Sequence, residues 1–193
     1  MQMEARAARD LIGDVERARR RSRARASTMW FPLMLFGTLS AVSAGVVVIY
    51  GGDALGPYWS VVGPAGGVAT AAHAAWRGRR VGVETRWGPY VAVGVMILAG
   101  TFAMGAGGAL VGRPMVSAVG PPLVVSAGYL FFARLEGSRL LGALALALAA
   151  FAVVLSLAGA GPEPTAATLA AVQGAVFAAT GLVLLVRKER RDP

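Results

Sequence analysis

The sequence has 193 residues, of which 56% are hydrophobic and 15% are charged, and its formal net charge is +9. Soluble domains contain roughly 25% charged residues, whereas the apolar residues here form runs of about 20, the length of a transmembrane helix. This composition argues against a soluble enzyme, a disordered chain and a nucleic-acid-binding domain. It also excludes disulfide bonds and thiolate metal sites, because the chain has no cysteine.

Residues 1–28 are polar and rich in arginine, and they predict an amphipathic cytoplasmic helix next to the membrane. Ala8, Leu11 and Val15 recur at helical spacing along one face. We expect no cleavable signal peptide, because the first apolar run begins only after this segment. The arginines are candidates for binding anionic lipid headgroups and fixing topology, or for docking a cytosolic protein or a second copy of the chain, rather than nucleic acid. They are Arg17, Arg19, Arg20, Arg21, Arg23 and Arg25.

Six apolar runs follow within residues 29–186, each predicted to cross the membrane as a helix because lipid offers no partner to exposed backbone groups. A basic cytoplasmic tail, 187–193, ends the chain. The second run is rich in glycine and interrupted by Pro64, so five spans are the alternative. The expected spans are about 30–51, 57–76, 87–108, 114–133, 140–158 and 165–186.

The basic residues give these spans an orientation. With the N-terminus in the cytoplasm, every basic residue except Arg113 falls on the cytoplasmic side, in 1–28, 77–86, 134–139 or 187–193. Cytoplasmic loops of membrane proteins carry such an excess of Lys and Arg. The sequence therefore predicts a multi-pass protein of the plasma membrane with both termini in the cytoplasm.

An internal repeat connects the first four spans. A shift of 57 residues places Trp30 on Trp87 and Gly63-Pro64 on Gly120-Pro121. Because each unit would be a hairpin with both ends in the cytoplasm, the pattern predicts a tandem parallel repeat, one of the arrangements found in transporters. The expected units are about 30–77 and 87–134, followed by 140–186, whose status as a third copy rests on topology alone.

The two Gly-Pro pairs form the candidate site. Proline inside a helix removes a hydrogen bond and favours a kink, and matching interruptions in two repeats point to a solute site. The alternative is a packing role, since Gly63 and Gly67 have the spacing of a close helix–helix contact. The residues of this candidate solute site or kink are Ser60, Gly63, Pro64, Ser117, Gly120, Pro121 and Pro122.

The spans carry no pattern of catalytic or metal-binding residues. No charged side chain lies at the centre of a span, where ion paths and substrate pockets are usually marked. His73, one helical turn from Arg77, cannot bind a metal by itself, and we expect an interfacial histidine satisfied by backbone or water. We therefore expect no enzyme activity, no cofactor and no metal.

Residues 8–21, Ala-Arg-Asp-Leu-Ile-Gly-Asp-Val-Glu-Arg-Ala-Arg-Arg-Arg, precede Trp30-Phe-Pro32 and spans rich in Ala, Gly and Val. In this layout the first third of the chain resembles small uncharacterised polytopic membrane proteins of high-GC actinobacteria. The resemblance implies a plasma-membrane protein that accompanies a cytosolic regulator, and it transfers no binding or catalytic residue.

The expected fold is thus an all-α bundle of six transmembrane helices preceded by the amphipathic helix. The expected function is a non-enzymatic interaction, scaffold or signalling-partner role, with the lipid bilayer, a second copy and a cytosolic protein as candidate partners. The alternative is a small transporter or channel for a neutral or weakly polar solute, with its site at the paired Gly-Pro kinks. A membrane enzyme comes third.

Overall fold

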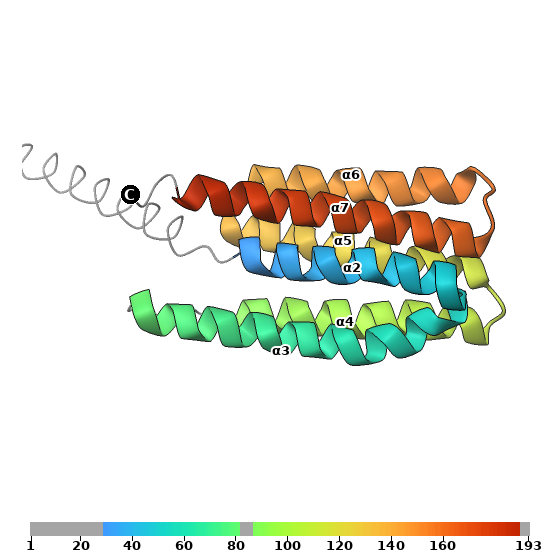
Figure 1. The fold of residues 1–193 in the computed structure, drawn as a ribbon, viewed down its shortest axis with the longest axis horizontal. Helices are drawn as coiled ribbons and strands as arrows, with labels where there is room; N and C mark the ends of the chain where they lie inside the picture. Colours follow the sequence, from blue (N-terminus) through green and yellow to red (C-terminus); the bar gives the residue numbers. More distant parts are fainter. Residues whose placement is uncertain (1–28, 82–86, 190–193) are drawn as a thin grey trace, which may run out of the picture.

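The structure, a computed structural model, describes residues 29–81 and 87–189, and the long elements in these ranges are all helices (Figure 1). The predicted N-terminal helix with its six candidate arginines lies outside the described residues, as do the last four residues of the basic tail. The elements are α2 (Trp30–Tyr50), the short 3₁₀ helix η1 (Gly52–Ala54), α3 (Leu55–Val81), α4 (Trp87–Leu110), α5 (Pro114–Glu136), α6 (Arg139–Leu157) and α7 (Pro162–Glu189).

Five of the six long helices are long and apolar enough to cross a membrane, as expected of a multi-pass membrane protein. The exception is α3, which forms a helix where the second span was predicted but is less apolar. Alanine and glycine dominate its sequence, and Thr70, His73 and Arg77 add polar groups to its second half. The five apolar segments are Trp30–Tyr50, Gly88–Leu110, Pro114–Glu136, Arg139–Leu157 and Pro162–Arg187.

The main core lies among α2, α5, α6 and α7. Leu33, Leu141 and Phe177 are almost completely buried there, and Tyr129 packs its ring 4.5 Å from that of Phe177. Figure 1 shows α3 and α4 together on one side of these four helices. Of the two, α4 packs along α5, whereas α3 forms an outer edge of the bundle with few contacts to α2 and α4.

The boundaries of α5 and the start of α6 have local causes. Pro114 occupies the first turn of α5, where its missing N–H costs nothing. Gly137 ends α5 in the left-handed conformation, with φ of +64°. Ser138 then begins α6, because its hydroxyl accepts a hydrogen bond from the backbone N–H of Leu141 at 3.3 Å.

The direction of the helices divides the charged side chains between two ends. Since α3 runs back beside α2, α4 begins at the end of the bundle where α2 also begins (Figure 1). The end of α3, the α5–α6 turn and the end of α7 lie together and carry what we call the basic end: Arg77, Arg79, Arg80, Arg134, Arg139 and Arg187. At the opposite end the backbone N–H of Gly52 points to the carboxylate of Glu163, 3.4 Å away.

The two predicted repeat units pack differently. In the second unit α4 and α5 lie against each other, whereas in the first unit α2 packs mainly on α7 and only loosely on α3. The equivalent glycines show the contrast. Gly37 faces the backbone of α7, while a Cβ on Gly94 would meet nothing within 4 Å. The duplication therefore stays a prediction from the sequence.

Candidate functional site

The first Gly-Pro pair lies on the outer side of the bundle. Helix α3 continues through Pro64, which is exposed. The hydroxyl of Ser60 donates to the carbonyl oxygen of Pro57 in the same helix, 2.8 Å away. A Cβ on Gly63 would lie 3.9 Å from Leu98 of α4, an ordinary contact distance. This part of the candidate site is therefore an open helix surface and not the wall of an enclosed pocket.

The second pair is packed between helices. The Ser117 hydroxyl donates to the carbonyl oxygen of Gly105 at 2.8 Å, which links α5 to α4. Gly120 is buried, and a Cβ there would lie 2.7 Å from the Cβ of Met104. Pro121 and Pro122 are half-buried inside α5, which continues through them as a helix. Glycine at position 120 thus serves the close approach of α4 and α5.

The structure does not bring the two Gly-Pro pairs together. Gly63 faces Leu98 and Gly120 faces Met104, so both pairs contact α4. Helix α4 separates them, and they line no common cavity among the hollows described below. The contact of Gly120 with Met104 supports a packing role for this glycine. The solute site at the paired kinks remains a prediction.

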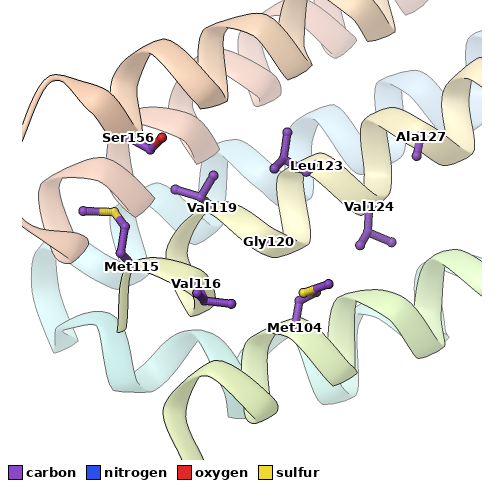
Figure 2. Close-up of a pocket in the computed structure, with 9 residues that line it drawn as sticks. All are labelled: Met104, Met115, Val116, Val119, Gly120, Leu123, Val124, Ala127 and Ser156. Carbon is purple, nitrogen blue, oxygen red and sulfur yellow. The ribbon is translucent and has the colours of Figure 1, made fainter. Parts of the chain in front are cut away.

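The best-formed hollow is a shallow groove of about 480 Å³ that follows α5 between α4 and α6 (Figure 2). Its walls are apolar apart from the hydroxyl of Ser156, which donates to the carbonyl oxygen of Val153 at 2.7 Å. An open groove of this chemistry suits an acyl chain or an apolar helix better than a polar solute. Its lining residues are Met104, Met115, Val116, Val119, Gly120, Leu123, Val124, Ala127 and Ser156.

A second groove, of about 460 Å³, lies between α2 and α7. It is also open and almost entirely apolar, and small side chains form much of its wall. A Cβ on Gly45 would meet nothing within 4 Å, so this part of α2 is free to receive an apolar group. The lining residues are Ala44, Gly45, Val48, Ile49, Ala167, Thr168 and Ala171.

A cluster of polar side chains lies instead at the basic end, between α2 and α3. The His73 ring stacks on Phe31 with ring centres 4.1 Å apart and meets Trp30 edge-on at 5.4 Å. Arg77 follows one turn later on α3. Within the part of the chain that the structure describes, four buried polar atoms have no hydrogen-bond partner, and all four belong to this region. They are Trp30 Nε1, Thr70 Oγ1, His73 Nε2 and Arg77 Nε.

Sequence reasoning noticed His73 but missed this cluster. Thr70, His73 and Arg77 are spaced i, i+3 and i+7 and therefore share one face of α3. Gly66, one turn earlier on that face, lies against Phe36 of α2, with a Cβ position 3.1 Å from its ring. The i, i+3, i+7 spacing was visible in the sequence, whereas the contact with Trp30 required the α2–α3 packing.

Among residues 29–81 and 87–189, no group of three or more His, Cys, Asp or Glu side chains could hold a metal ion. No protein-family model, no curated protein and no solved structure matches the chain.

Proposed function

We propose that this chain is a plasma-membrane protein that crosses the bilayer six times, with both termini in the cytoplasm, and acts as a non-enzymatic interaction or scaffold protein. The supporting fold evidence is the course of α3. Although it is less apolar than the other helices, it returns along the bundle and places the start of α4 at the basic end (Figure 1). Six crossings would put the basic end in the cytoplasm, where the loops of membrane proteins carry an excess of Lys and Arg.

The observation that carries the interaction role is the closed packing inside the bundle. The backbones of α2 and α7 touch at glycines, and the two best-formed hollows are apolar grooves on the bundle surface. A transporter needs a path with polar groups that replace the hydration of its solute. The geometry therefore supports contacts made through the outer faces better than passage through the centre.

The outer faces offer small-residue surfaces on three helices. A Cβ on Gly45 of α2, Gly67 of α3 or Gly94 of α4 would meet nothing within 4 Å. In membranes, small residues let helix backbones approach one another closely. The arginine-rich segment 1–28 adds a cytoplasmic surface for lipid or a protein partner, as the sequence predicts.

The absence of cysteine makes a direct test simple, because every introduced thiol is unique. Single variants Gly45→Cys, Gly67→Cys and Gly94→Cys are oxidised in native membranes, with the almost isosteric Ser43→Cys, at a buried position, as control. We expect a cross-linked species from at least one outward position and none from Ser43→Cys. If all three variants stay monomeric and the protein carries solute flux in liposomes, the interaction role is wrong and the transporter is the better account of the function.

A further inference from the structure

The α2–α3 seam at the basic end has the composition of a binding site for a phosphoryl group. Its four polar atoms without partners come from four side chains on two helices. Trp30 Nε1–H and Arg77 Nε–H can only donate, and the Thr70 hydroxyl and the His73 ring can also donate. A site with at least two obligatory donors suits a ligand that accepts hydrogen bonds.

Within the described residues, none of these four atoms has a hydrogen-bond partner. The aromatic neighbours Phe31 and Trp76 add no acceptor oxygen to the seam. Buried donors nearly always find a partner, so an orphaned set in one place indicates an absent ligand or ordered water. Arg77 adds a positive charge, which favours an anionic acceptor over a neutral one.

The position of the seam indicates where that anion comes from. Trp30 begins α2, and Arg77 is followed on α3 by Arg79 and Arg80 at the basic end. Tryptophan and arginine at the end of a span lie at the level of the lipid headgroups. A phospholipid there would present its phosphate to the cluster while its acyl chains follow the apolar helix faces.

We propose that Trp30, Thr70, His73 and Arg77 bind the phosphate of a phospholipid from the cytoplasmic leaflet in the seam between α2 and α3. The proposal rests on the membrane placement in the proposed function, and it adds a specific lipid site to a chain otherwise held by general hydrophobic and electrostatic attraction. Bound at this site, the lipid would join α3 to α2, where direct helix contacts are few.

Native mass spectrometry of the full chain in detergent tests the site. Phosphatidylglycerol is compared with a glucosyl diacylglycerol of the same acyl chains, which has no phosphate. We expect a first lipid to bind with clear preference for phosphatidylglycerol, and Arg77→Gln to weaken it about tenfold, the value of one lost charge-assisted hydrogen bond. The matched control is Arg80→Gln, whose guanidinium lies 4.2 Å over the Trp76 ring instead, and which we expect to change the affinity little.

Two milder variants keep the test valid if Arg77→Gln misfolds. Trp30→Phe keeps an aromatic ring but loses the N–H together with the rest of the five-membered ring, and Thr70→Val keeps the shape and replaces only the hydroxyl. Each variant should weaken the binding of phosphatidylglycerol and leave the binding of the glucolipid unchanged. Equal affinity for both lipids, or equal effects of Arg77→Gln and Arg80→Gln, would mean that water alone satisfies the cluster and would overturn the site.

Inorganic phosphate separates the two sources of the anion. If millimolar phosphate displaces phosphatidylglycerol as effectively as added lipid does, the site is one for free phosphate and the lipid assignment fails. Carbonate extraction of native membranes is run in parallel. Protein released by carbonate would overturn the membrane placement itself, whereas retained protein without phosphate preference would overturn only the lipid site.

Discussion

Gly37 of α2 and Gly174 of α7 face each other where the backbones of the two helices meet. A Cβ on Gly37 would lie 2.9 Å from the carbonyl oxygen of Gly174, and a Cβ on Gly174 would lie 2.9 Å from the carbonyl oxygen of Gly37. The contact is reciprocal and involves backbone on both sides, so neither helix can yield by rotating a side chain. These two glycines therefore fix the distance between the N-terminal and the C-terminal span.

Gly37→Ala should lower the free energy of unfolding by about 1–3 kcal/mol, because the added methyl group forces α2 and α7 apart. Gly45→Ala on the same helix is the matched control, since a Cβ there would meet nothing within 4 Å. Alanine favours the helix by up to about 1 kcal/mol over glycine, so this variant should be neutral or more stable. Denaturation in mixed micelles measures both, and changes of the same sign and size would contradict the contact.

Ser117→Ala should be about 0.6 kcal/mol less stable than Ser60→Ala, the mean value of an interhelical hydrogen bond in a membrane protein. Ser117 bonds across to Gly105 of α4, whereas Ser60 bonds within its own turn. Both variants gain the same helix propensity, so their difference reports the interhelical bond. Equal stabilities would show that Ser117 contributes no more than a surface serine.

Tyr90→Phe should lower the free energy of unfolding by about 1 kcal/mol, because the Tyr90 hydroxyl donates to the Glu136 carboxylate at 2.7 Å and ties the start of α4 to the end of α5. Tyr50→Phe serves as control, since Tyr50 is 74% exposed at the end of α2. Chemical denaturation of the two variants gives the comparison. If Tyr50→Phe lowers the free energy of unfolding as much as Tyr90→Phe, the hydrogen bond between Tyr90 and Glu136 contributes no specific stability.

Pro64→Ala and Pro121→Ala should leave solute flux unchanged, because α4 lies between the two Gly-Pro pairs and the interaction role requires no path through them. The measurement is stopped-flow light scattering of liposomes with glycerol or urea, with protein-free liposomes as control. Flux above that control, lost in both variants, would restore the transporter and its paired site.

Local signals in the sequence predicted much of the helix pattern. Pro114 marked the start of α5 correctly, because it acts on neighbouring backbone groups, whereas α5 continues to Glu136, three residues beyond the predicted end near 133. Helix α3 runs on to Val81, beyond the predicted end near 76, since nothing in Arg77-Gly78-Arg79-Arg80 prevents a helix from leaving the apolar region.

The packing partners of each helix were harder to predict from the sequence than the helices themselves. The repeat suggested that α2 would pair with α3 as α4 pairs with α5, yet α2 pairs with α7, through glycines more than 130 positions apart along the chain. Spans that are apolar all around give no periodic face to indicate a partner. The polar cluster of Trp30, Thr70, His73 and Arg77 was missed for a different reason, because it exists only once α2 and α3 lie together.

The six-crossing topology is the central claim, and unique cysteines test it most directly. Asp53→Cys lies in η1 at one end of the bundle, and Arg139→Cys lies at the start of α6 at the basic end, both at exposed positions. Intact cells are treated with a membrane-impermeant maleimide and compared with permeabilised cells. We predict that Asp53→Cys is labelled in intact cells and Arg139→Cys only after permeabilisation. Labelling of Arg139→Cys in intact cells would contradict the topology.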